Sequence, residues 1–352
     1  MPKNIVFCAD GTWDKPQSPV SVTCSDTNVC KLYNLLTKTA DQMPFYDSGV
    51  GADGLPLQHL LGGALGAGLY QKIKDGYTAI AQVYDQDDKI FIFGFSRGAY
   101  TARALAGMIA VCGLPTQNFS QQLVEAAFSA YRQTDPAKRK AAVAALALYD
   151  AQITMVGVWD TVGALGIPAI IGGVDPVAYG FLDTNLHPDV HNAFHGMAID
   201  ERRVEFKPTL WTGPFATEQN VDQVWFTGVH CDVGGSYPQT GLSDITLSWM
   251  LNKAVPLGLD VIQPEASQYT FPLDPKHALD TIHDSWSLLW GFPVHRAIAA
   301  NATIANSVEI RIAAKIGYQP PNVVRDAAGL PAAGYGSEQV VAVPAVAAAA
   351  VG

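Results

Sequence analysis

The chain has 352 residues, 49% of them hydrophobic, which is enough for a large core in one α/β enzyme domain with insertions. Its 22 Lys and Arg against 32 Asp and Glu give a formal net charge of −10, which argues against a nucleic-acid partner. Five cysteines, an odd number without paired metal-type spacing, favour folding in a reducing compartment. No signal peptide precedes the first expected strand, so we expect synthesis in the cytoplasm.

The N-terminal part of the chain predicts alternating strands and helices. A glycine-rich stretch over 62–68 resembles a phosphate-binding loop, but it lacks the Gly-Lys-Ser/Thr ending and is interpreted as close packing. The expected elements are a buried strand over 4–8, a helix that begins at Thr27 or Asn28, a strand over 44–47 and an amphipathic helix over 69–84.

The most informative stretch lies in the next segment. Residues 90–95 form an apolar, β-branched and aromatic run, which is typical of a strand buried on both faces. The run ends in a Gly-x-Ser-x-Gly motif centred on Ser96, and an Ala-rich helix over 99–112 follows. This order of strand, motif and helix indicates a nucleophile elbow. Gly94 and Gly98 remove side chains that would collide in so tight a turn, and Ser96 is then exposed at a helix N-terminus.

The middle of the chain predicts two further strands that end in polar residues. Asp160 follows one of them, and His230 follows the other. The expected elements are helices over 119–132 and 136–149, a strand over 153–158, a helix over 188–200, a strand over 222–229 and a helix over 243–257 capped by Ser243.

This alternation predicts an α/β fold of the α/β-hydrolase type, with a mostly parallel central sheet, helices on both faces and helical insertions. We expect one catalytic domain over 1–330, with helical or cap insertions at about 117–150 and 164–188. Residues 331–352 are rich in Ala and Val, and we expect them to form a low-complexity tail without chemistry.

Four predicted strands end in residues that can do chemistry: Asp10, Ser96, Asp160 and His230. Ligands bind at the carboxyl ends of parallel strands, so these side chains are expected at one site. A serine needs a base to take its proton, an imidazole suits that role, and a carboxylate fixes the imidazole. The order Ser96, Asp160, His230 is the triad order of α/β-hydrolases, so we predict these three as nucleophile, acid and base.

Other histidines and acids compete for these roles. His187, His191 and His195 lie on or near the helix expected over 188–200, where surface or structural roles are commoner than metal binding. His283 and His295 do not follow a predicted strand. Asp232 is so close to His230 that it more often orders the loop by accepting from backbone N–H groups, and Asp244 suits a helix terminus. We expect neither a metal nor another cofactor.

An oxyanion hole needs two preorganised donors. One is expected to be the backbone N–H of Arg97, the residue after the nucleophile. The other is expected from the loop after the first strand, where Gly11 and Thr12 are the best candidates. Asp10 would then brace that loop, although an Asp before a Gly is also common in ordinary turns.

Several motifs in one order also resemble the catalytic domain of type VI secretion lipase effectors, many of which are known only as an uncharacterised conserved domain. The resemblance runs from about Lys3 to Val324. It rests on Phe7-Cys8-Ala9-Asp10-Gly11-Thr12-Trp13, Gly94-Phe95-Ser96-Arg97-Gly98-Ala99-Tyr100-Thr101-Ala102-Arg103, Gly157-Val158-Trp159-Asp160-Thr161-Val162-Gly163 and Gly228-Val229-His230-Cys231-Asp232-Val233-Gly234-Gly235.

The resemblance implies an α/β-hydrolase fold, hydrolysis of glycerophospholipid esters, and Ser96, Asp160 and His230 as the triad. It also implies transient contact with a membrane surface, export by a type VI route and an immunity or delivery partner. The chain departs from the family at Asp14 and Ser236, where Asn and Gly are commoner, and we expect it to lack the extra membrane-docking segments of characterised effectors.

Three functions stay open on the sequence alone. The leading one is a serine hydrolase for lipid esters that works through an acyl-enzyme, with an apolar stretch over 166–182 as an acyl pocket, a lid or an ordinary loop. The second is a soluble carboxylesterase for small or polymeric esters. The third is a non-catalytic binding module that keeps the fold.

Overall fold

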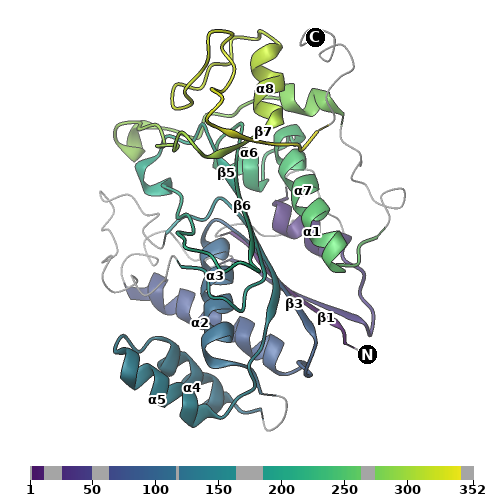
Figure 1. The fold of residues 1–352 in the computed structure, drawn as a ribbon, viewed down its shortest axis with the longest axis vertical. Coiled ribbons are helices and arrows are strands. Elements are labelled where there is room, and N and C mark those ends of the chain that lie inside the picture. Colours follow the sequence, from purple (N-terminus) through teal and green to yellow (C-terminus); the bar gives the residue numbers. More distant parts are fainter. Residues whose placement is uncertain are drawn as a thin grey trace.

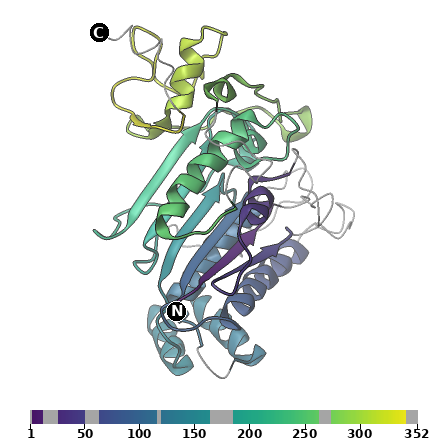
Figure 2. The same ribbon diagram turned by 90° about the vertical axis from the view of Figure 1, so that its right-hand side faces the viewer.

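The computed structural model describes residues 2–11, 26–49, 63–115, 119–163, 185–262 and 274–341. These residues form one parallel sheet of eight strands in the order β2-β1-β3-β4-β5-β6-β7-β8, whose strands Figures 1 and 2 show running through the molecule. The strands are β1 (Asn4–Ala9), β2 (Gln42–Asp47), β3 (Lys89–Phe95), β4 (Ile153–Trp159), β5 (Asn192–Ala198), β6 (Asn220–Phe226), β7 (Thr303–Ala305) and β8 (Gly336–Glu338). An α/β fold is therefore confirmed.

Helices cover both faces of the sheet. Helices α2 to α5 pack on one face and α1, α6 and α7 on the other, while α8 packs near β7 at the end of the sheet (Figure 1). The helices are α1 (Asn28–Leu35), α2 (Gly63–Ala81), α3 (Arg97–Cys112), α4 (Gln121–Tyr131), α5 (Pro136–Leu146), α6 (His230–Gly234), α7 (Gly241–Ala254) and α8 (Asn306–Ala313). In the ranges described, no helix combines the length and apolar character that a bilayer span requires.

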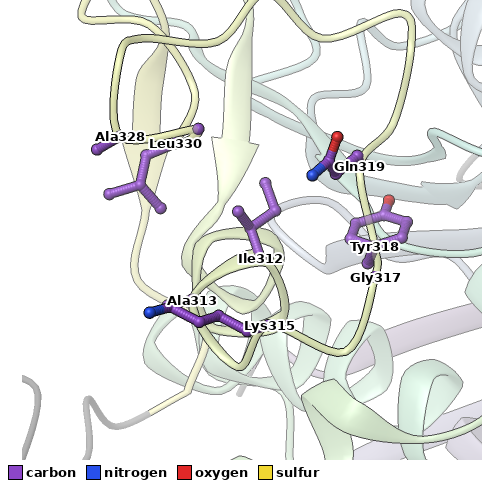
Figure 3. Close-up of a pocket in the computed structure, with 9 residues that line it drawn as sticks. Ile312, Ala313, Lys315, Gly317, Tyr318, Gln319, Ala328 and Leu330 are labelled. Carbon is purple, nitrogen blue, oxygen red and sulfur yellow. The ribbon is translucent and has the colours of Figure 1, made fainter.

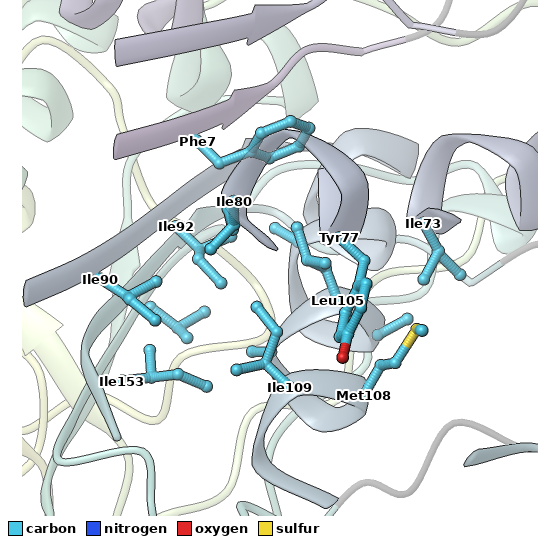
Figure 4. Packing of buried hydrophobic residues seen from close by; sticks show 14 of the residues in the cluster. Phe7, Ile73, Tyr77, Ile80, Ile90, Ile92, Leu105, Met108, Ile109 and Ile153 are labelled. Carbon is cyan, nitrogen blue, oxygen red and sulfur yellow. The ribbon is translucent and has the colours of Figure 1, made fainter. Parts of the chain in front are cut away.

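The sequence of β3 is apolar from Ile90 to Phe95 because both faces of the strand are buried in the core. Its side chains alternate between two hydrophobic clusters, with Ile90 and Ile92 on the α2–α3 side and Phe91 and Phe93 on the α1–α7 side. Figure 4 shows Ile90 and Ile92 packed with side chains of α2 and α3. Because both faces of the strand are buried, neither face can carry polar residues, and β3 is held rigidly at the centre of the sheet.

The strand order places a topological switch beside β1. The chain goes from β1 to β2 on one side and then to β3 on the other, so the connections leave β1 and β3 in opposite directions. Such a reversal opens a crevice at the carboxyl ends of the two strands, where α/β proteins bind ligands. Asp10 follows β1 and Ser96 follows β3, so both predicted site residues lie at the carboxyl ends of the two strands that flank this switch.

Two predicted elements differ from the structure. The helix expected over 188–200 is wrong, because Asn192–Ala198 is strand β5, paired in parallel with β4 and β6. Its residues include Ala, Phe and Met but no Val, Ile or Thr, so pairing on both sides decides the conformation against local composition. Helix α7 begins at Gly241, so Ser243 is not the cap; its hydroxyl donates to the carbonyl of Thr240.

The C-terminal part contributes more to the fold than the sequence indicates. Strand β8 comes from the stretch that we expected to be a tail, and it pairs with β7. Within that stretch, Val340 and Val341 are buried and Glu338 accepts a hydrogen bond from the Trp249 indole at 3.0 Å. Residues 336–341 therefore pack with the sheet.

Candidate active site

Ser96 lies on a strained turn between β3 and α3. Its φ of 58° and ψ of −121° fall in a region that residues with a side chain rarely adopt. The turn is closed by glycines, since a Cβ on Gly94 would lie 2.5 Å from the Gly98 carbonyl oxygen. A Cβ on Gly98 would lie 2.2 Å from the Ala9 carbonyl oxygen. The elbow predicted from the motif is therefore present, pressed against the loop that follows β1.

His230 and Asp160 meet in a buried pair. His230 is the first residue of α6, and its Nδ1 lies 2.6 Å from Oδ2 of Asp160, which directly follows β4. A carboxylate can only accept, so Nδ1 carries the proton and the neutral ring keeps a lone pair on Nε2. Asp160 is fully buried with φ of 39°, and its Oδ1 accepts the Ala198 N–H at 3.0 Å.

Arg296 makes a bidentate ion pair with the same carboxylate. Its Nη1 donates to Oδ1 of Asp160 at 2.7 Å and its Nη2 to Oδ2 at 2.8 Å. The guanidinium also donates to the carbonyls of Ala198 and Phe206, and Arg296 is 7% exposed. Burial alone would raise the pKa of Asp160, but Arg296 and His230 hold it well below its ordinary value. Asp160 therefore stays ionised.

Two aromatic rings enclose the imidazole of His230. The Phe95 ring lies 4.6 Å from it between centroids, and the Phe206 ring meets it edge-on at 4.8 Å. Phe95 immediately precedes Ser96, so this contact brings the end of β3 beside the start of α6. Burial lowers the pKa of His230, and the neighbouring Asp160 offsets part of that effect.

Glu201 is a second carboxylate close to His230. Its Oε2 accepts the His230 backbone N–H at 3.3 Å and the Ser285 hydroxyl at 3.0 Å. Arg203 pairs with it through both Nε and Nη2, at 2.9 and 2.8 Å. Burial would raise the pKa of Glu201, but its bonds with Arg203 lower it to about 2. Glu201 thus holds the backbone of His230, whereas Asp160 holds its ring.

Asp10 braces the loop after β1. It accepts hydrogen bonds from the Thr27 hydroxyl at 2.7 and 2.8 Å, from the Tyr46 hydroxyl and from the Gly11 N–H at 2.7 Å. Burial raises its pKa to about 6 in spite of these donors. The Gly11 N–H thus donates to Asp10, and its expected role as an oxyanion donor stays a prediction. Thr12 lies outside the described residues, as does the apolar stretch over 166–182.

The competing residues have other partners. Asp232 accepts the N–H groups of Val229 and His283 at 3.0 and 3.1 Å and the His283 ring Nδ1 at 2.6 Å, so it orders its loop as expected. Asp244, in the first turn of α7, pairs with Lys31 at 3.0 Å. Neither carboxylate is recorded in a bond with the His230 ring.

The three clustered histidines do not share a helix. His195 is buried in β5, where its Nε2 accepts the Thr161 N–H at 3.0 Å, and burial lowers its pKa to about 3. His187 lies in a turn before β5, with Nδ1 3.4 Å from an Asp189 oxygen. Over the described part of the chain, no group of three or more His, Cys, Asp or Glu side chains could hold a metal ion.

A pocket of about 420 Å³ lies beside α8 (Figure 3). Its lining comes from α8 and the chain after it, including Ile312, Tyr318 and Leu330. The Tyr318 hydroxyl donates to Asp200 at 2.9 Å and so ties this region to the end of β5. None of its lining residues is a predicted site residue.

One known family matches most of this chain. The family model described as "T6SS, Phospholipase effector Tle1-like, catalytic domain" matches residues 3–253. The chain belongs to this family. The match covers most of the chain and includes Ser96, Asp160 and His230, which confirms the resemblance found in the sequence motifs. It ends well before Val324, to which we had expected the resemblance to extend.

The individual relatives of this Tle1-like domain are distant. An uncharacterised protein of Saccharomyces cerevisiae is 29% identical over 239 residues, which are 60% of this chain and 33% of that protein. A crystal structure of an uncharacterised Pseudomonas aeruginosa protein is 19% identical, with a TM-score of 0.44, over 75% of this chain and 47% of that one. A structure of the Tle1 effector bound to the VgrG spike is 18% identical, with a TM-score of 0.36, over 67% and 51%. The Tle1-like chain thus spans a third to about half of each relative.

Two residues that this Tle1-like site uses were missed in the sequence. Arg296 lies beyond the stretch that the family model matches, in an irregular segment without a recognised motif. Glu201 follows β5 among other charged residues, and the sequence predicts no role for it.

Proposed function

We propose that the chain hydrolyses carboxylic esters of lipids through an acyl-enzyme on Ser96. The observation that carries the proposal is the 2.6 Å contact between His230 Nδ1 and Asp160, in a ring that packs on the residue preceding Ser96. A nucleophile on a strained elbow, a neutral imidazole and an ionised carboxylate are the parts that acyl transfer needs. Membership of a phospholipase effector family supports a lipid ester as the substrate.

In the proposed reaction, Ser96 Oγ attacks the carbonyl carbon while its proton passes to Nε2 of His230. The tetrahedral intermediate then collapses, the bond to the alcohol oxygen breaks, and His230 returns the proton to that oxygen. Water repeats the sequence against the acyl-serine, which releases the fatty acid and restores Ser96. Asp160 remains ionised throughout and stabilises the imidazolium.

Arg296 is a positioning residue in this proposal. It touches neither Ser96 nor the ring of His230 in any recorded contact, but it donates to both oxygens of Asp160. A buried carboxylate without a partner would become protonated, and a neutral Asp160 could not hold the Nδ1 proton in place. The guanidinium therefore keeps the acid charged and fixes its plane.

The oxyanion donors remain proposals. Arg97 begins α3, so its N–H belongs to the first helical turn, beside Ser96, where the dipole favours negative charge. Such donors contribute about 3–4 kcal/mol each to transition-state stabilisation. Thr12 is still a candidate for the second donor, whereas the Gly11 N–H would first have to leave Asp10.

Substrate range and partners follow from the family name only as proposals, since the chain spans a third to about half of its relatives. We propose a glycerophospholipid ester as substrate and delivery by a type VI secretion system, with an immunity partner as a further expectation. A soluble carboxylesterase is the outcome if only short, water-soluble esters are cleaved.

The test compares Ser96→Ala and His230→Ala with the parent and with Ser337→Ala, an exposed serine in β8. Substrates are phosphatidylcholine vesicles and a water-soluble p-nitrophenyl ester, and a fluorophosphonate probe with peptide mass analysis locates the nucleophile. We expect losses of more than about 10³-fold in kcat for the first two variants and labelling at Ser96 alone. Parent-like turnover by a folded Ser96→Ala protein would refute the proposal.

A further inference from the structure

The segment 283–296, here called the strap, is fastened at both ends to the candidate active site. At its start, the His283 ring Nδ1 lies 2.6 Å from Asp232, and the Ser285 hydroxyl donates to Glu201 at 3.0 Å. At its end, Arg296 holds Asp160. The strap thus contacts both the carboxylate that holds the His230 ring and the one that accepts its backbone N–H.

The middle of the strap exposes large apolar side chains. Phe292 is 90% exposed and Leu288, in the short helix η7 (Leu288–Trp290), is 84% exposed. Val294 is 54% exposed on the returning limb. The ten residues from 285 to 294 include no charged side chain. Isolated exposed apolar residues are ordinary, but several on one uncharged projection mark an interaction surface.

This tip is braced by its own hydrogen bonds. The Trp286 indole donates to the Gly291 carbonyl at 3.1 Å, and the Gly291 N–H donates to the Leu288 carbonyl at 3.2 Å. Gly291 has a φ of 71°, which a residue with a side chain would adopt only with strain. Because the turn is already formed, little conformational entropy remains to be lost when the tip binds.

A chain of rings connects the tip with His230. The Trp290 ring meets the Phe206 ring edge-on at 5.4 Å, and Phe206 meets the His230 ring at 4.8 Å. The Arg203 guanidinium lies 3.5 Å from the centre of the Phe206 ring and 5.1 Å from that of the Trp290 ring, so it makes cation–π contacts with both rings. Whatever binds Leu288 and Phe292 therefore lies close to the proposed catalytic base.

We propose that the tip of the strap docks on a lipid surface, with Leu288 and Phe292 entering the boundary between headgroups and acyl chains. The inference rests on the proposed function, because a lipid ester must reach Ser96 from such a surface. Apolar side chains flanked by tryptophans suit that boundary. The uncharged tip and the net charge of −10 point to a zwitterionic surface, because a lipid surface with anionic headgroups would repel the chain.

Binding is measured with vesicles of pure phosphatidylcholine, by flotation and by the shift of tryptophan fluorescence. Ser96→Ala serves as the background, so that hydrolysis does not alter the vesicles. We expect Phe292→Asp and Leu288→Asp to lower the partition coefficient by more than about ten-fold, since each loses apolar burial and adds a charge. Phe292→Ala and Leu288→Ala give smaller losses in the same direction.

The controls are Ile316→Asp and Val324→Asp, which place the same charge at apolar positions 52% and 59% exposed outside the strap. We expect both to bind as the parent does, and binding to be unaffected by added salt. Failure of the Ser96→Ala protein to float with vesicles, parent-like flotation of Phe292→Asp, or loss of flotation in salt would overturn the proposal.

Hydrolysis separates this proposal from the function on which it rests. With Ser96 restored, the ratio of the rate on vesicle phosphatidylcholine to the rate on a soluble p-nitrophenyl ester should fall about ten-fold in Phe292→Asp. A protein that floats with vesicles but cleaves neither substrate would refute the proposed function and leave the docking surface supported. An unchanged ratio in Phe292→Asp would count against docking alone.

Discussion

Arg296 and Asp160 form two nearly equal hydrogen bonds, of 2.7 and 2.8 Å, in a site where both side chains are buried. The same Oδ2 that accepts from Arg296 also accepts from the His230 ring. Asp160 therefore divides its negative charge between a permanent cation and an imidazole that is positive only when protonated. This arrangement makes the acidity of the imidazole depend on a residue that does not touch it.

Replacing Arg296 should shift the pH profile as well as lower activity. In Arg296→Met the buried Asp160 loses the guanidinium that keeps it ionised, so it stabilises the imidazolium less; the pKa of His230 should fall and the acidic limb of kcat/KM should move to lower pH. The unfolding free energy should fall by about 3–5 kcal/mol, because a buried charge loses its partner. Arg296→Lys keeps the positive charge but loses the bidentate hydrogen bonds. The acidic limb of kcat/KM should therefore stay near its position in the parent, while kcat is reduced.

The matched control for this series is Arg325→Met, which removes a cation from a loop after α8. Its pH profile and denaturation midpoint should match those of the parent. A profile of Arg296→Met that superimposes on the parent profile after scaling would show that Arg296 has only a structural role.

In the parent protein, the fall of kcat/KM on the acidic side should occur below pH 6.5, the ordinary pKa of histidine. His230 acts as a base only when neutral, and burial lowers its pKa below the ordinary value of 6.5. Activity on a soluble ester should therefore be full near pH 7 and fall as the pH drops through that lowered value. The measurement is kcat/KM against pH, and a half-maximal point above pH 7 would contradict the assignment of His230.

The two paired carboxylates should lose their contribution to stability at a lower pH than the one at which activity falls. Glu201 has a folded pKa of about 2, below its ordinary 4.5, and the pKa of Asp160 is also lowered. The stability that these carboxylates contribute is present above their unfolded pKa values and is lost only as the pH falls from about 4.5 toward 2. The buried imidazoles of His195 and His230, whose pKa values are lowered, do cost stability as the pH falls below 6.5, so circular dichroism over the same pH range is the control that separates loss of the base from unfolding.

Adding one methyl group at Gly98 should damage the elbow. Its Cβ would lie 2.2 Å from the Ala9 carbonyl oxygen and 2.4 Å from that of Asp10, so backbone must move. We expect Gly98→Ala to lower the unfolding free energy in urea by about 1–3 kcal/mol and to reduce activity by moving Ser96. Gly196→Ala, whose Cβ meets its nearest atom at 3.4 Å, should cost less. Equal stability of Gly98→Ala and the parent would argue against so tight a turn.

The sequence predicted those elements whose local pattern and tertiary setting agree. The buried runs over 4–8, 90–95 and 153–158 correspond to β1, β3 and β4, because a strand covered on both faces has to be apolar throughout. Strand β5 could not be found this way. It lacks β-branched residues, and its conformation depends on hydrogen bonds to β4 and β6.

The candidate site residues could be predicted where a sequence motif or the end of a strand marks them. The Gly-x-Ser-x-Gly turn, the polar residue after β4 and the histidine that begins α6 identify Ser96, Asp160 and His230, and their catalytic roles remain predictions. No motif marks Arg296, since it lies in an irregular segment and meets Asp160 only through the tertiary fold. The direction of the Gly11 N–H also depends on a side-chain rotamer of Asp10 that spacing does not encode.

Because Arg296 lies late in the chain, it is synthesised after the other residues of the candidate site. Ser96, Asp160 and His230 all leave the ribosome earlier, and Arg296 follows Asp160 by 136 positions. A nascent chain can build the elbow and most of the sheet, but its acid has no guanidinium to keep it charged in a dry interior. In the proposed function, Asp160 would therefore gain its guanidinium partner only after the strap has left the ribosome.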